Sequence, residues 1–233
     1  MSNVVQRNGV RVVAFNKSGS ASIINTFSCS VDKEPERSER SLDVLRGTWD
    51  KAINFPDPII TIAYFRHPLL RVASVYNYFF TLARDEQATV HFMEDLFPTQ
   101  EVTTKIAKTP FRENLIKLGF NQDMSFEVFC DHLITSHVDL TADLHLKRQS
   151  ESFVECRGKS TDTWIARLDE IETAWPQMVR TWGMDCTTKI AHLNKKNYSW
   201  ITMYQDIPVI AKLLLQLYHD DYRIWELRRC SLL

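Results

Sequence analysis

Residues 9–22 read GVRVVAFNKSGSAS, and this stretch decides the fold that we expect. Residues 10–15 form a short run of apolar and β-branched residues before a turn signal, which predicts a buried strand of a parallel sheet. Residues 16–22 then supply one lysine, one glycine and three serines, and apolar residues follow at helical spacing. A strand, a small-residue turn and a helix in this order direct backbone N–H groups toward an anion. An ordinary corner with an exposed lysine is the alternative interpretation of this stretch.

A second stretch repeats this arrangement further along the chain. Residues 59–65 (IITIAYF) predict another buried strand, which ends at Arg66, and an apolar helical pattern follows to about residue 83. Ser74 lies about two turns into that helix, so Arg66 and Ser74 can face one point above the carboxyl edge of the sheet. Two corners suited to anions indicate a ligand with two phosphates, and they predict that the two strands are neighbours.

The stretches FNKSGSAS (residues 15–22) and FRHPLLRVASVY (residues 65–76) resemble the two signature motifs of PAPS-dependent sulfotransferases. Their pattern is closer to the Golgi carbohydrate sulfotransferases than to the cytosolic small-molecule enzymes. PAPS is 3′-phosphoadenosine 5′-phosphosulfate, the co-substrate that donates the sulfuryl group. The resemblance implies that the first motif holds the 5′-phosphosulfate through Lys17, Ser18, Gly19, Ser20, Ala21 and Ser22. It implies that the second motif holds the 3′-phosphate through Arg66 and Ser74, which lie eight residues apart as in the family.

The likeness to this family is weaker outside the two phosphate motifs. Asn16 stands where the family usually has a proline, and Asp169 stands where it commonly has a glutamate. Further similar stretches are DLHLKRQ (residues 143–149), WIARLDEI (residues 164–171) and HLNKKNYS (residues 192–199). The resemblance therefore runs from residue 10 to about residue 225, and it is specific only at the two motifs.

The catalytic base is less well defined by the sequence. In many sulfotransferases it comes from the chain after the phosphate loop, but no histidine lies between Ser22 and Arg66. Our first choice is His145, in an H-x-x-x-Q pattern similar to the family's, because a neutral imidazole can take a proton from a sugar hydroxyl. A purely structural histidine is the alternative. Acidic residues of the segment after the loop remain candidates too: Glu34, Glu36, Glu39, Asp43 and Asp50.

The length and the remaining patterns predict the architecture. The 233 residues suffice for a single domain with a full core. We expect an α/β domain, P-loop-like and three-layered, with a central parallel sheet of four or five strands and helices on both faces. Residues 85–110 are interpreted as an insertion over the cleft. Further strands are expected at 164–168 and 189–193, and further helices at 126–134, 169–182, 206–218 and 220–227.

The composition of the chain limits the classes of partner and the cellular compartment that we expect. A net charge of −1 argues against a nucleic-acid binder, which needs a basic excess. The five cysteines show no metal-ligand spacing, so no metal is expected and reduced thiols are favoured, with a Cys156–Cys186 disulfide as the lesser alternative. The first ten residues are too polar for a signal peptide, and no apolar run reaches the roughly 20 residues of a membrane anchor. We therefore expect a soluble cytoplasmic protein.

These observations predict a sulfotransferase that moves a sulfuryl group from PAPS to a hydroxyl of an acceptor, with a carbohydrate as the first choice. Lys17 would neutralise the negative charge that grows on the leaving phosphate, so no metal is required. A P-loop-type kinase is a competing interpretation, although its motif has glycine before the lysine whereas Lys17 precedes Gly19. A non-catalytic nucleotide-binding relative and a structural domain are two further candidates.

Overall fold

The computed structural model describes residues 3–28, 58–84, 110–121, 123–160, 162–190 and 208–227. Its contacts divide the chain into two compact units. The first unit consists of Met1–His67, Arg148–Asn197 and His219–Leu233, and the second of Pro68–Lys147 and Tyr198–Tyr218. The single domain that we expect from the sequence stays a prediction. Residues 85–109 of the expected insertion lie outside the described residues.

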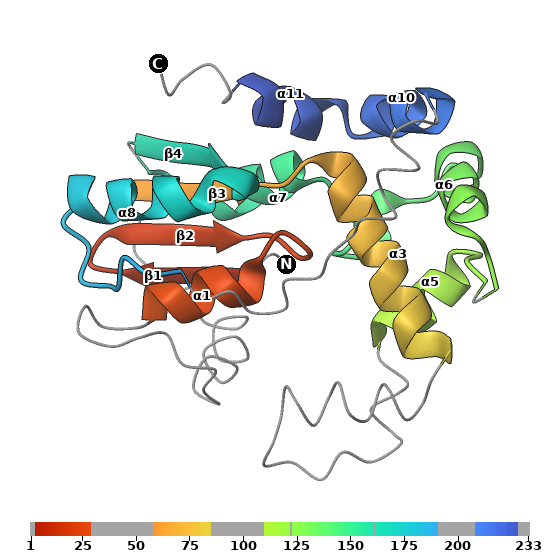
Figure 1. The fold of residues 1–233 in the computed structure, drawn as a ribbon, viewed down its shortest axis with the longest axis horizontal. Coiled ribbons are helices and arrows are strands. Elements are labelled where there is room, and N and C mark those ends of the chain that lie inside the picture. Colours follow the sequence, from red (N-terminus) through yellow and green to blue (C-terminus); the bar gives the residue numbers. More distant parts are fainter. Residues whose placement is uncertain are drawn as a thin grey trace, which may run out of the picture. The chain divides into compact units, whose positions relative to one another are not determined.

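In the described residues of the first unit, four strands form a sheet in the order β1-β2-β3-β4 (Figure 1). Its strands are β1 (Asn3–Arg7), β2 (Val10–Ala14), β3 (Ile60–Phe65) and β4 (Asp162–Arg167). β2 pairs with β3 in parallel, which confirms that the two motif-bearing strands are neighbours, and β3 pairs with β4 in parallel. β1 runs antiparallel to β2, so the sheet is mostly parallel: the expected parallel arrangement holds for β2, β3 and β4 but not for the edge strand β1.

The antiparallel edge strand follows from a two-residue turn at Asn8 and Gly9. Both residues have positive φ, +50° and +77°, and Arg7 pairs directly with Val10 across the turn. Two consecutive residues with positive φ form the tight turn whose twist matches that of a hairpin, and Asn-Gly is its preferred sequence. The chain therefore adds β1 to the edge of the sheet before the parallel part begins.

Helices cover both faces of this sheet, which gives the first unit three layers. On one face, Val12, Ile62 and Tyr64 pack with residues of α1 (Ser20–Ser28) and α8 (Ile171–Thr181). On the other face, Val13, Phe15 and Phe65 pack with residues of α7 (Gln149–Cys156) and α11 (His219–Leu227). All side chains of β2 and β3 are buried, as expected for central strands of an α/β sheet.

The second unit is helical in its described part. It contains α3 (Pro68–Arg84), α5 (Pro110–Lys117), α6 (Phe126–Thr135), α10 (Pro208–Leu217) and the 3₁₀ turn η3 (Leu140–Ala142). The Ser125 side chain accepts a hydrogen bond from the Val128 N–H and so caps α6. The predicted apolar stripe of α6 is buried in this unit's core: Phe126, Phe129, Cys130 and Leu133.

Some local expectations needed correction. The helix expected at 169–182 begins as a 3₁₀ turn, η4 (Leu168–Glu170), continues as α8 and ends before Gly183, which has a φ of +55°. Residues 189–190 of the expected strand 189–193 are not in a strand, and the rest lies outside the described residues. Cys156 and Cys186 are thiols, which is the state that the sequence favoured over a disulfide. No helix among the described residues is long and apolar enough to cross a membrane.

Candidate functional site

The turn after β2 forms a corner at the carboxyl edge of the sheet. Lys17 and Gly19 both have positive φ, +61° and +71°, and the Ser18 N–H donates to the Phe15 carbonyl at 3.1 Å. α1 begins at Ser20, and its first N–H groups have no acceptor within the helix because an α-helix bonds each N–H to the fourth residue back. The corner therefore directs N–H groups and the positive end of a helix toward one side, which suits an anion.

The Leu168 side chain packs closely against Gly19 at this corner, and this leads to a stability prediction. A Cβ at Gly19 would lie 3.0 Å from Leu168 Cδ1, whereas a Cβ at Gly183, also at positive φ, would have no atom within 4 Å. Both Gly→Ala changes share the cost of a left-handed alanine, about 1–2 kcal/mol. We expect Gly19→Ala to lose about 1 kcal/mol more in the free energy of unfolding because it also overpacks the site. Urea unfolding measures both, and equal losses would contradict close packing at Gly19.

The side chain of Gln149 connects the two predicted phosphate motifs. The Ser18 hydroxyl, which is fully buried, donates to Gln149 Oε1 at 2.7 Å. The same oxygen accepts the Arg66 N–H at 3.0 Å, and Gln149 Nε2 donates to the Arg66 carbonyl at 2.9 Å. Ser18 thus directs its hydroxyl to another side chain, so within the first motif it supports the shape of the turn.

Arg66 makes a second connection between the motifs. Its Nη1 donates to the Lys17 carbonyl oxygen at 2.6 Å, so the residue after β3 holds the turn after β2. This hydrogen bond uses one of the five N–H donors of the guanidinium. The structure therefore places Lys17 and Arg66 side by side at the carboxyl edge, where α/β proteins bind ligands.

Two further ionisable side chains, Arg167 and His67, lie at this edge. Arg167, at the end of β4, forms ion pairs with Asp169 and Glu170. Its guanidinium carbon lies 4.0 Å from the centroid of the Trp225 ring. The His67 ring packs edge-on against the same Trp225 ring, with the ring centroids 4.7 Å apart. Burial lowers the pKa of His67, and the Arg167 charge lowers it further while Asp169 raises it in part. The His67 imidazole is therefore favoured in its neutral form, and it adds no fixed positive charge.

His145 forms a hydrogen-bonded pair with Asp143 in the second unit. Its Nδ1 lies 2.8 Å from Asp143 Oδ1, which also accepts the His145 backbone N–H. Asn114 donates to the other carboxyl oxygen at 3.2 Å, and the Tyr78 ring stacks on the imidazole with centroids 6.0 Å apart. Burial raises the pKa of Asp143, but hydrogen bonds and charge from His145, with the bond from Asn114, lower it more. The pair therefore consists of a carboxylate that orients an imidazole.

The predicted site residues are divided between the two units. Residues 17–22 and Arg66 belong to the first unit, whereas Ser74, with 7% exposure on α3, and His145 belong to the second. The acidic candidates for the base lie outside the described residues: Glu34, Glu36, Glu39, Asp43 and Asp50. The sequence alone did not indicate that Gln149 holds Ser18 and Arg66, although Gln149 closes one of the similar stretches.

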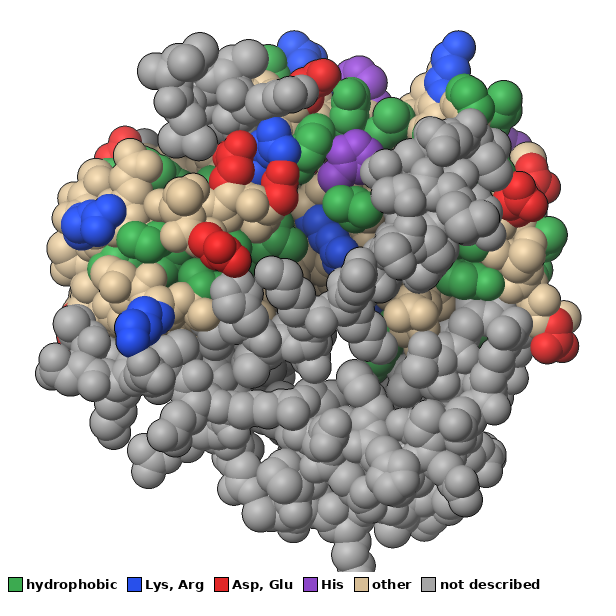
Figure 2. All heavy atoms as spheres, in the orientation of Figure 1, with side chains coloured by type: hydrophobic (Ala, Val, Ile, Leu, Met, Phe, Trp, Pro, Cys, Tyr) green, Lys and Arg blue, Asp and Glu red, His purple; other side chains and the backbone are tan. Residues whose placement is uncertain are grey.

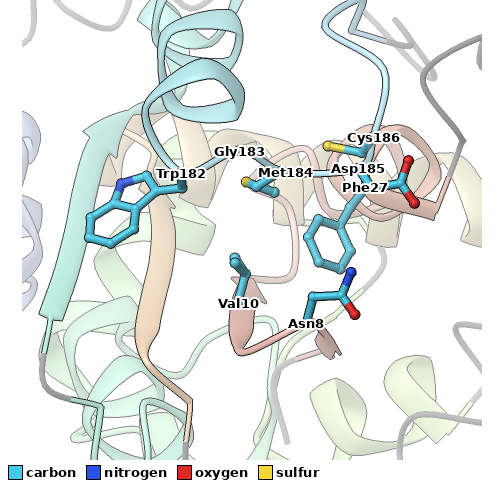
Figure 3. Close-up of a pocket in the computed structure, with 8 residues that line it drawn as sticks. All are labelled: Asn8, Val10, Phe27, Trp182, Gly183, Met184, Asp185 and Cys186. Atoms are coloured by element: carbon cyan, nitrogen blue, oxygen red, sulfur yellow. The ribbon is translucent and has the colours of Figure 1, made fainter.

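A pocket in the first unit lies at the other end of the sheet (Figure 3). It is lined by Asn8, Val10, Phe27, Trp182, Gly183, Met184, Asp185 and Cys186. Val10 is the first residue of β2, whereas Lys17 lies three residues after Ala14, the last residue of that strand. In Figure 3, Val10 and Phe27 both point into this pocket. Because it lies at the opposite end of β2 from the turn of residues 16–19, the pocket does not belong to the anion corner that this turn forms with Arg66 and the start of α1.

Within the described part of the chain, neither the charged side chains nor the possible metal ligands indicate another kind of site. Acidic and basic side chains of the described residues are interspersed on the face in Figure 2, in keeping with the net charge of −1. Among the described residues, no group of three or more His, Cys, Asp or Glu side chains is placed to hold a metal ion. No family model, curated protein or solved structure matches the chain.

Proposed function

We propose that this protein is a sulfotransferase that moves a sulfuryl group from PAPS to a hydroxyl of an acceptor, with a carbohydrate as the first candidate. The proposal includes a P-loop-like fold for the first unit. The observation that carries it is the hydrogen bond from Arg66 Nη1 to the Lys17 carbonyl. It supports the proposal because the two stretches that resemble phosphate motifs meet at adjacent parallel strands.

The proposed reaction follows from charge at the Lys17 corner. The bond between sulfur and the bridging phosphate oxygen breaks as the acceptor oxygen bonds to sulfur, and the acceptor's proton passes to a base. Negative charge then grows on the phosphate oxygen that leaves. The Lys17 ammonium and the N–H groups at the start of α1 would stabilise this charge more in the transition state than in the ground state.

His145 is the proposed base. A carboxylate that accepts the Nδ1–H of a histidine fixes the ring orientation and leaves Nε2 as the nitrogen that takes a proton. The bond between Asp143 and His145 has this form, and the depressed pKa of Asp143 keeps its carboxyl ionised at neutral pH. The hydrogen bond between Asp143 and His145 does not depend on the identity of the acceptor.

The sharpest test of the proposal compares two nucleotides at Arg66. Arg66→Ala should weaken binding of adenosine 3′,5′-bisphosphate by about 1.5–3 kcal/mol more than binding of adenosine 5′-phosphate, the range for hydrogen bonds to charged groups. Any loss that comes from releasing the Lys17 carbonyl affects both nucleotides, so the difference reports the 3′-phosphate. Calorimetric titration of both nucleotides measures it.

Two controls accompany this experiment. Arg180→Ala removes an exposed arginine from the last turn of α8 and should leave both affinities unchanged. Transfer of labelled sulfate from PAPS to a panel of glycans distinguishes an enzyme from a non-catalytic binder. Equal losses for the two nucleotides would mean that Arg66 only holds the fold, and no binding of the bisphosphate to the unaltered protein would refute the proposed function.

A further inference from the structure

α7 begins without a cap from its own N-terminal residues. The N-cap residue Arg148 makes no side-chain capping bond. Instead, the backbone N–H groups of Gln149 and Ser150 each donate to the carboxylate of Asp221 at 2.8 Å, and the Ser150 hydroxyl donates to it at 2.7 Å. A residue of α11, about 70 positions further along the chain, therefore caps this helix.

The environment of Asp221 marks it as a specific contact rather than a surface cap. Its side chain is fully buried, and a buried carboxylate is costly unless donors satisfy it. Here three donors and the positive end of a helix do so. Loss of this carboxylate would leave the first N–H groups of α7 buried without their acceptor, and the first turn would shift.

Gln149, the first residue of α7, carries the effect of this cap to the anion corner. Its amide oxygen accepts the N–H of Arg66 and its amide nitrogen donates to the Arg66 carbonyl, which is the pairing that a neighbouring strand would provide. Arg66 directly follows β3, which ends at Phe65. The same amide oxygen accepts a hydrogen bond from the buried hydroxyl of Ser18, in the turn after β2. A continuous set of hydrogen bonds therefore leads from Asp221 through the start of α7 to both motif-bearing turns.

We propose that Asp221 and Gln149 are positioning residues that set the geometry of the anion corner at Lys17 and Arg66. They act through Ser18 and Arg66 and need not touch the ligand. The proposal deepens the proposed function, and its effect on nucleotide affinity rests on that function. The expected effect of Asp221 and Gln149 on the local structure of the corner does not rest on the proposed function.

The first measurement is amide hydrogen exchange, which needs no ligand. Asp221→Asn weakens the cap and Gln149→Met removes the amide at similar size, so each should speed exchange of the Arg66 N–H, which donates to Gln149 Oε1. Thr61→Val is the matched control because it removes a buried side chain–backbone bond, to Arg157, elsewhere in β3. We expect about a tenfold faster exchange at Arg66 in the two variants than in Thr61→Val, as for a lost buried hydrogen bond.

The second measurement is the dissociation constant of adenosine 3′,5′-bisphosphate. It should rise about tenfold in Asp221→Asn and in Gln149→Met, the scale of one hydrogen bond, and by much less in Thr61→Val. If Asp221→Asn fails to fold, Ser150→Ala takes its place, since it removes only one of the three bonds to Asp221 and should change both readouts in the same direction by a smaller amount.

The two measurements separate failure of this inference from failure of the proposed function. If the unaltered protein binds no bisphosphate, the function is refuted, while exchange at Arg66 still tests the positioning role. If exchange at Arg66 in the two variants equals that in Thr61→Val, Asp221 and Gln149 do not position the corner. Faster exchange with unchanged nucleotide affinity would also overturn the proposal, because the network would then not shape the binding site.

Discussion

Replacing Lys17 by alanine is expected to lower sulfuryl transfer from PAPS by about 100-fold or more, the effect of losing one group that stabilises charge in the transition state. Nucleotide binding should weaken much less, because in the proposed reaction the charge that Lys17 would neutralise grows only as the sulfuryl group leaves. Lys17 has a φ of +61°, and alanine bears the same backbone strain as lysine there. The free energy of unfolding should therefore change little, and the lost turnover should report the missing ammonium group.

Two further variants serve as controls for Lys17. Lys17→Gly removes the same ammonium group but relieves the left-handed strain, so it should be as inactive as the alanine variant and somewhat more stable. Lys117→Ala removes an exposed lysine from the last turn of α5 and should keep full turnover. Steady-state transfer of labelled sulfate measures all three variants. Turnover near that of the unaltered protein in Lys17→Ala would remove Lys17 from the mechanism.

Replacing His145 by alanine is expected to lower turnover by about 10²–10⁴-fold, the usual contribution of a general base. Binding of adenosine 3′,5′-bisphosphate should persist. In the unaltered protein, the rate should fall at acidic pH, because a protonated imidazole cannot accept the acceptor's proton. Asp143→Asn should also reduce turnover, since an amide does not hold the Nδ1–H as a carboxylate does.

The matched control for His145 is His219→Ala, which removes an exposed histidine that lies 3.2 Å from Asp220. It should leave both the rate and its pH profile unchanged. If His145→Ala keeps the rate and the pH profile of the unaltered protein, the base lies elsewhere, and the acidic residues of 28–51 are the next to be replaced.

The sequence predicted the central strands well because their signal is local. Within the run IITIAYF, residues 60–65 form β3 and are all buried as expected, and only Ile59 lies outside the strand and is exposed. The antiparallel β1 was missed although a local signal, Asn8-Gly9, was present between two β-branched runs. α7 was missed because its cap is Asp221, which no spacing around residue 149 indicates.

The candidate site shows the same division between local and distant signals. Lys17 lies in the turn three residues after β2 ends, and Arg66 directly follows β3, so the sequence could place both near the ends of the two strands. The hydrogen bond between them is possible because β2 pairs with β3. The connection of Ser18 to Gln149 joins residues 131 positions apart, so only the fold reveals it. A buried side chain that bonds a distant backbone leaves no periodic pattern in the sequence.

The spread of the corner along the chain also determines when it forms during synthesis. The hairpin of β1 and β2 needs only neighbouring residues, but the corner also needs Arg66, Gln149 and Asp221. At about 5–20 residues per second, a ribosome takes roughly 8–30 s to add the chain from residue 66 to residue 221. On the nascent chain, β2 and β3 are therefore present before Gln149 and Asp221, which complete the corner, have been made. Pairings between such distant segments form slowly, so the corner is completed only after the last of these segments has been made.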